Sequence, residues 1–115
     1  MEIKVLKNRE DIFILELHGS LDLYSSTQLK DLVMKLIEGK TEGIIIDLKE
    51  VDKVKSAGMG ALISISSTLK KINCALAIAN TCDTVKKAME AARLSVYLPI
   101  VPTLREAVEY ISKNK

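Results

Sequence analysis

A continuous apolar run rich in β-branched side chains occupies residues 43–48, Gly43-Ile44-Ile45-Ile46-Asp47-Leu48. Such a run is typical of a strand that is buried on both faces of a parallel sheet. A second run of this kind, from Cys74 to Ala79, predicts another buried strand. Between the two runs, apolar residues recur at helical spacing, at Ala61, Leu62, Ile65, Leu69 and Ile72. This unit predicts parallel strands joined by a crossover helix.

The residues before this unit predict an antiparallel hairpin. Apolar residues 3–6 and the β-rich segment 12–17 lie at hairpin distance, and the polar residues 8–11 between them are typical of a turn. The second strand is expected to end at the sequence Gly19-Ser20-Leu21-Asp22. A helix follows, with its apolar stripe at Leu29, Leu32, Val33, Leu36 and Ile37 and with Gly39 placed to end it.

Capping residues indicate where the other helices start. Ser25 and Ser26 offer N-caps for the helix after the hairpin. Residues 80–83 open a helix after the second buried strand, and Thr103 caps a final helix. Residues 96–101 lie next to Pro102 and predict an edge strand or a loop. The order β-β-α-β-α-β-α-(β)-α therefore predicts one α/β domain over residues 1–115, with a mixed, mostly parallel sheet of four or five strands and about four helices.

Charge and hydropathy exclude several classes of function. The 115 residues include 17 basic and 15 acidic side chains, which are interspersed and give a net charge of +2. This balance provides no electrostatic footprint for direct binding of nucleic acid. The chain is charged from its second residue, unlike a signal peptide, and its apolar runs are too short to span a bilayer. We therefore expect no membrane insertion.

The side chains that commonly bind metals are sparse. His18 is the only histidine, and the two cysteines, Cys74 and Cys82, are eight residues apart with no CxxC spacing. We expect both cysteines to be buried, reduced thiols. No metal or cofactor is predicted, and reduced thiols without a leader sequence indicate a cytoplasmic protein.

The segment from Lys49 to Gly60 carries the strongest functional signal. Residues 49–55 are expected to form a loop after the buried strand, and Ser56 then begins a helix with the sequence Ser56-Ala57-Gly58-Met59-Gly60. The first turn of a helix leaves N–H groups unpaired and carries partial positive charge. Ser56 is either a plain N-cap or an exposed acceptor of an anionic group. The glycines either permit close helix–sheet packing or let a partner approach the backbone.

This segment resembles the signature of the anti-sigma factor antagonist (STAS) family, in which a strand reading hydrophobic-Asp/Asn-Leu precedes a loop Asp-Ser-(Ser/Thr/Ala)-Gly-(Leu/Val)-Gly. Upstream, Gly19-Ser20-Leu21-Asp22 resembles the Gly-(Glu/Asp)-(Leu/Ile/Val)-Asp loop of that family. The resemblance covers essentially the whole chain and includes the order of its elements. Two motifs at this separation are much more specific than either one alone.

The resemblance implies a phosphorylation-controlled partner switch. The unphosphorylated antagonist binds an anti-sigma factor with serine kinase activity and frees the sigma factor, and phosphorylation of its serine releases the complex. A phosphatase then resets the cycle. The phosphorylated residue maps onto Ser56. The resemblance places partner-binding residues at Asp22, Lys55, Ser56, Ala57, Gly58, Met59 and Gly60.

Two departures from the family pattern concern charge. Lys55 stands where the family usually has Asp, and Ser20 replaces the commoner acid. The change at Lys55 indicates either a partner with a complementary acidic surface or a site that the kinase no longer recognises. The alternative function is accordingly a non-phosphorylated STAS scaffold or transporter accessory that binds a protein or small ligand through the same loops.

An enzyme is the third possibility. It would need a pocket at the strand ends lined with paired polar groups, for which the sequence offers only Ser20, Asp22, Asp47 and Ser56. Neither a P-loop nor a nucleophile elbow is present, so we expect no enzymatic activity.

Overall fold

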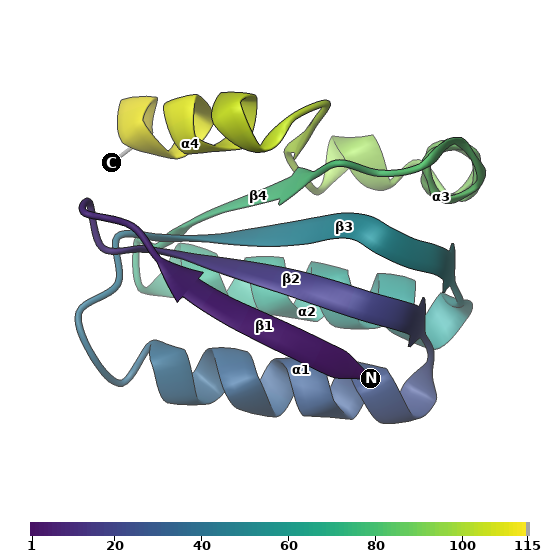
Figure 1. Ribbon diagram of the computed structural model, residues 1–115, viewed down its shortest axis with the longest axis horizontal. Coiled ribbons are helices and arrows are strands. Elements are labelled where there is room, and N and C mark those ends of the chain that lie inside the picture. The colour runs from purple at the N-terminus through teal and green to yellow at the C-terminus, as the bar shows by residue number, and fades with distance from the viewer. Residues whose placement is uncertain (115) are drawn as a thin grey trace.

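The computed structural model describes residues 1–114 and contains one mixed sheet with helices on both faces (Figure 1). Its elements, in chain order, are β1 (Glu2–Lys7), β2 (Ile12–Leu21), α1 (Leu23–Leu36), β3 (Gly43–Val54), α2 (Ser56–Lys71), β4 (Ala75–Ala79), α3 (Asp83–Ala91), the 3-10 helix η1 (Leu94–Val96), β5 (Ile100–Val101) and α4 (Leu104–Lys113). The strands lie in the order β1-β2-β3-β4-β5. β1 is antiparallel to β2, and the other neighbouring pairs are parallel. The predicted fold class is confirmed.

Two layers of helix cover the sheet. α1 and α2 pack on one face, while α4 covers the other face (Figure 1). The larger core cluster joins Leu29 and Val33 of α1 to Leu62 and Leu69 of α2. The smaller cluster joins Ala107 and Ile111 of α4 to Ile12, Ile45 and Ala77 of the sheet. The triple isoleucine run of β3 is fully buried because alternate side chains enter the two clusters.

The structure corrects the expected ends of β2 and β3. Residues 19–21 were expected to break the second strand and residues 49–55 to form a loop, but β2 continues to Leu21 and β3 to Val54. Pairing between these strands persists through register shifts after Glu16 and Gly19. Gly19 accommodates this irregular course with a φ of 117°, in the region that favours glycine.

Capping agrees with the sequence at one helix and differs at another. Thr103 caps α4 as predicted, since its hydroxyl accepts the Glu106 N–H at 3.1 Å. Neither Ser25 nor Ser26 caps α1, because Asp22 occupies that position. An aspartate carboxylate is as effective an N-cap as a serine hydroxyl, and it lies earlier in the chain.

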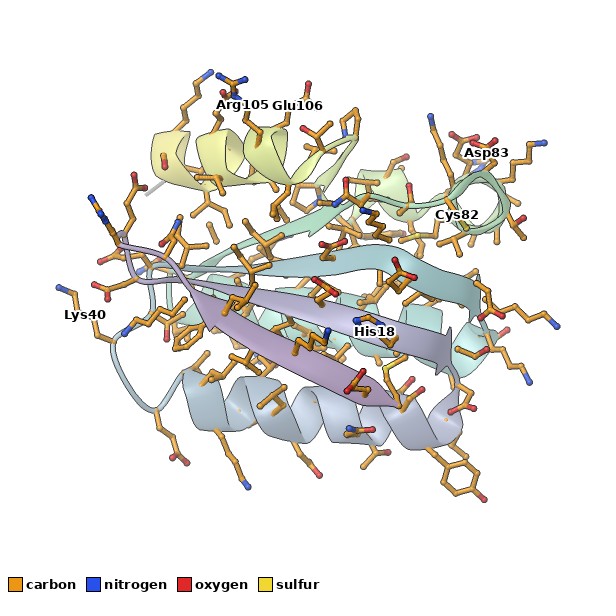
Figure 2. All side chains as sticks on the ribbon, viewed as in Figure 1. His18, Lys40, Cys82, Asp83, Arg105 and Glu106 are labelled. Atoms are coloured by element: carbon orange, nitrogen blue, oxygen red, sulfur yellow. The ribbon has the colours of Figure 1, made fainter. Side chains whose placement is uncertain are left out.

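Several polar and connecting residues also differ from expectation. Serine and threonine at residues 64, 66, 67 and 68 are typical of the solvent-facing side of a helix, but Ser66 is buried. Residues 96–101, expected to be extended, begin in η1 and contribute only the two-residue strand β5. Cys74 is buried as predicted and precedes β4, whereas Cys82 is exposed at the start of α3 (Figure 2).

The two free thiols are expected to differ in reactivity. Burial raises the pKa of Cys74 from 9.0 to about 11, and nearby Glu42 adds to this rise. The thiolate is the nucleophile, and at neutral pH its population is about 100-fold lower at Cys74 than at a thiol with a pKa of 9.0. Cys74 should therefore react far more slowly. We expect N-ethylmaleimide to modify Cys82 alone in the folded protein and both thiols in urea, as measured by peptide mass spectrometry. Equal labelling of both thiols in the folded protein would contradict this arrangement.

Candidate functional site

Parallel pairing of β2 with β3 brings the two sequence motifs together. Ser20 lies opposite Lys53, and Leu21 lies opposite Val54. Directly after the paired segment, the Lys55 N–H donates to the Leu21 carbonyl oxygen at 2.9 Å. The loop that ends β2 and the start of α2 therefore form one continuous surface at the same edge of the sheet.

The two glycines of the second motif have different surroundings. A Cβ on Gly58 would lie 2.6 Å from the Leu21 carbonyl oxygen, so only glycine permits this close contact between α2 and β2. A Cβ on Gly60 would meet nothing within 4 Å, and Gly60 is exposed. Gly58 therefore serves helix–sheet packing, whereas Gly60 leaves room at the surface. Met59 is half-buried and packs against the larger core cluster, and Ala57 is also half-buried.

Ser56 presents a free hydroxyl at the first turn of α2. It is exposed, and none of the hydrogen bonds among residues 1–114 involves its Oγ atom. Lys55 holds the N-cap position and makes no side-chain capping bond. Ser56 is therefore not the N-cap of α2, which was one of the two roles that the sequence left open for it. Its hydroxyl lies beside backbone N–H groups that no side chain caps, which is a suitable environment for an anionic group.

Hydrogen bonds between Asp22 and Ser25 fix the conformation of the first motif, residues 19–22. Its carboxylate accepts the Ser25 N–H at 3.0 Å, while the Ser25 hydroxyl accepts the Asp22 N–H at 2.8 Å. The same hydroxyl donates to the Ser20 carbonyl oxygen at 2.8 Å. Hydrogen bonding of the Asp22 carboxylate to Ser25, first to its backbone N–H and then to its hydroxyl, lowers the pKa of Asp22, and the Tyr24 backbone and the positive charge of Lys55 add smaller contributions. Asp22 is therefore an anchored carboxylate, and Lys55 is close enough to affect its ionisation.

The lowered pKa of Asp22 predicts a loss of stability in acid. A carboxyl group whose pKa falls on folding stabilises the protein above its unfolded pKa, near 3.9, and this contribution disappears as the pH falls through the folded pKa. We expect the urea midpoint to fall less between pH 5 and pH 2 in Asp22→Asn than in the wild type. Asp31→Asn, an exposed change on the same helix, should retain the wild-type dependence. Identical pH profiles for all three proteins would contradict this role of Asp22.

Charged side chains of both signs surround the site. The Ser20 hydroxyl donates to the Asp52 carboxylate at 3.0 Å, which ties the end of β2 to β3. Lys53 and Lys55 are exposed near this contact. The surface thus offers two lysines to an anionic group, with acids that balance its charge.

Other polar residues lie in structural contacts. Asp47 is buried and accepts from the Lys49 N–H at 3.0 Å and from the Asn80 amide at 3.2 Å. His18 projects from β2 (Figure 2), and its Nε2 atom is hydrogen-bonded to Glu16 Oε1 at 2.8 Å. Within residues 1–114, no group of three His, Cys, Asp or Glu side chains is arranged to hold a metal ion. Nor does this part of the chain contain a helix with the length and apolar character that a bilayer span requires.

Sequence reasoning missed two apolar residues beside the site. Leu23 and Tyr24 follow Asp22 at the start of α1, and they are 66% and 85% exposed. Both lie off the buried stripe that contains Leu29 and Val33. The sequence could have identified both residues, because they are large apolar side chains that directly follow a cap and lie outside that stripe. Exposed aromatic side chains of this kind are common anchors in protein interfaces.

Comparison with known proteins agrees with this architecture. Residues 4–107 match the family model of the STAS domain. TM1081 from Thermotoga maritima, a candidate anti-sigma factor antagonist, is 18% identical with a TM-score of 0.87 over 96% of this chain and 94% of that one. The unphosphorylated anti-sigma factor antagonist SpoIIAA of Bacillus is 18% identical with a TM-score of 0.80 over 97% of each chain.

A relative of another kind has the same fold. A sulfate transporter family protein from Wolinella succinogenes is 17% identical with a TM-score of 0.79 over 94% of this chain and 89% of that one. At these identities the structural likeness establishes the fold, while the family model covers most of the chain. The chain belongs to the STAS domain family.

Proposed function

We propose that this protein is an anti-sigma factor antagonist, itself not an enzyme, whose partner binding is controlled by phosphorylation of Ser56. The observation that carries the proposal is the exposed, unbonded hydroxyl of Ser56 at the uncapped start of α2. The loop of Asp22 lies beside it, joined through the bond from Lys55 to Leu21. In the unphosphorylated state this surface binds an anti-sigma factor with serine kinase activity in the cytoplasm, which frees the sigma factor for transcription.

Phosphorylation of Ser56 leaves the fold intact in this mechanism. A phosphate adds about −1.5 to −2 charges and three strong acceptor oxygens. At the first position of α2 it lies at the positive end of the helix dipole and beside Lys55. No buried contact has to break, because the Ser56 side chain is exposed.

The same phosphate opposes binding to the partner. A dianion at the interface must lose water, and it faces a kinase that already holds the negative charge of ATP. A misplaced charge pair at an interface costs several kcal/mol, enough to release a complex. A phosphatase then restores the binding state. SpoIIAA has been solved in both its unphosphorylated and its phosphorylated form, which supports such a cycle for a protein of the same fold.

Leu23 and Tyr24 provide the apolar part of the proposed interface. Their exposed side chains extend the surface formed by Asp22, Lys55 and Ser56. Apolar anchors supply most of the affinity in protein interfaces, while a charge at the rim determines which partner binds. Affinity and switching therefore depend on different residues of one surface.

The second candidate function is a scaffold or transporter accessory that is never phosphorylated. Lys55 favours this candidate, because it replaces the acid that usually precedes the serine of the family. The likeness to a sulfate transporter family protein is consistent with it. The same loops would then bind a protein or small ligand without regulation at Ser56.

A capture experiment separates the two functions. Wild-type and Ser56→Asp proteins serve as baits in lysate of the source organism, and mass spectrometry identifies what each retains. The proposal predicts an ATP-binding anti-sigma kinase on the wild type and its loss from Ser56→Asp. If both baits retain the same partners, or neither retains such a kinase, the scaffold function replaces the switch.

A further inference from the structure

A pocket of about 700 Å³ opens at the far end of α2 from Ser56. Its walls come from the last turns of α2 and α4 and from the segment around η1, and residues 74–76 at the start of β4 form its floor. Lys70 lies in its wall, fourteen residues after Ser56 along α2, which corresponds to about 21 Å. The volume is in the range of ligand-binding pockets, and the proposed switch does not use it.

The floor of this pocket is an open strand edge. β5 pairs only with Ile78 and Ala79 of β4. On this edge, the Ile78 N–H donates to the Pro99 carbonyl oxygen at 2.9 Å. On the other edge of β4, the Ala75 N–H donates to the Glu42 carbonyl oxygen at 3.4 Å. Because backbone groups point alternately to the two sides of a strand, the N–H and C=O of Leu76 point to the edge that β5 leaves open.

Pro99 prevents the chain from closing this edge itself. In a continued parallel ladder, residue 99 would donate to the Leu76 carbonyl oxygen, but proline has no N–H. The N–H groups of Tyr97 and Leu98 both donate instead to the Leu94 carbonyl oxygen, at 2.9 and 2.8 Å. Leu76 is only 6% exposed, so its unpaired backbone groups lie at the base of a cavity and not on open surface. Buried backbone groups of this kind are normally hydrogen-bonded.

The charges and apolar groups of the pocket indicate what completes the edge. Among residues 1–114, Lys70 is the only charged residue in its lining, and none of the lining side chains from this part of the chain is a carboxylate. The exposed side chains of Val96 and Tyr97 lie beside the opening and offer apolar contact, with 75% and 56% of their surface accessible. A ligand that matches this lining has a backbone to pair with Leu76, an apolar side chain and a negative charge.

We propose that this pocket binds an extended acidic peptide segment of a partner protein. The segment adds to β4 as a short strand through the N–H and C=O of Leu76, and an acidic side chain pairs with Lys70. Strand addition to an open sheet edge is a general mode of peptide recognition, in which the backbone bonds supply affinity and the side-chain pockets supply selectivity. The site is separate from the surface around Ser56, so phosphorylation there leaves peptide binding unchanged.

The test uses the full chain and a defined probe. A phage-displayed library of random octapeptides is selected on the wild-type protein, and recovered sequences are synthesised with a fluorescent label for titration. We expect peptides with at least one Asp or Glu among β-branched residues. Lys70→Glu should weaken their binding at least tenfold, while Lys71→Glu, a change at the next residue of α2, which is also exposed, should alter it less than threefold.

Amide hydrogen exchange measured by NMR tests the strand addition independently of any substitution. In the free protein the Leu76 amide should exchange at least tenfold faster than the Ala77 amide, which faces β3. Bound peptide should slow the Leu76 exchange at least tenfold and leave the residues around Ser56 unshifted. The proposal would be overturned if no peptide were recovered, if Lys70→Glu bound peptide as tightly as the wild type, or if bound peptide did not slow exchange at Leu76. A small molecule or a second copy of the chain would then be the remaining candidate occupant of the pocket.

Discussion

Ser56→Asp is expected to weaken binding of the captured anti-sigma partner at least 30-fold, equivalent to about 2 kcal/mol, while the protein remains folded. The new carboxylate lies at the exposed start of α2, where the helix dipole tolerates it, but it places an unpaired negative charge in the interface. Titration calorimetry gives the affinity, and circular dichroism gives the thermal midpoint.

Two matched variants separate charge from the loss of the hydroxyl. Ser56→Ala removes the hydroxyl without adding charge and should bind within threefold of the wild type. Ser67→Asp adds the same charge at an exposed position eleven residues further along α2 and should bind normally. Equal weakening by Ser56→Ala, or normal binding by Ser56→Asp, would show that charge at Ser56 does not control the interface.

Gly58→Ala is expected to destabilise the protein by about 1–3 kcal/mol, the usual cost of forcing extra atoms into a packed contact. The new methyl group would lie 2.6 Å from the Leu21 carbonyl oxygen and 2.9 Å from Leu21 Cγ. The carbonyl belongs to the backbone of β2 and also accepts the Lys55 N–H, so it cannot move without loss of that bond. The free energy of unfolding is measured by urea denaturation.

Gly60→Ala is the matched control for this substitution. It introduces the same methyl group two residues later in the same helix, where nothing lies within 4 Å. Alanine is favoured over glycine inside a helix, so this variant should be more stable than the wild type by about 0.5–1 kcal/mol. Similar effects at the two glycines would mean that the contact between α2 and Leu21 does not constrain the position of α2.

The core strands could be predicted from sequence because burial on both faces leaves a simple pattern. The run from Ile44 to Ile46 is apolar because helices cover both faces of β3 there. Beyond Asp47, β3 has no β4 residue opposite it and pairs only with β2. Its buried residues in that part, Leu48, Val51 and Val54, are three apart because the register shifts interrupt the normal alternation. That spacing conceals the strand, which explains why a loop was expected.

The candidate site could be predicted in part. Motif resemblance and the helix start pointed to Ser56, and the resemblance also placed Asp22 in the site. The role of Gly58 could not be derived locally, because it depends on Leu21, 37 residues away in the chain but in direct contact with it. The cap of α1 was expected at Ser25 or Ser26, although Asp22 is the cap and Ser25 its reciprocal partner. Either side chain can cap a helix, and only the backbone conformation decides between them.

Incubation of the wild-type protein with its captured anti-sigma partner and Mg²⁺-ATP tests the proposed switch most directly. Tandem mass spectrometry locates any phosphate, and size-exclusion chromatography of the same sample follows the complex. We predict phosphate on Ser56 and dissociation of the complex at the same rate, with Ser56→Ala remaining bound throughout. Phosphate on another residue alone, or a complex that persists after Ser56 is fully phosphorylated, would contradict the switch.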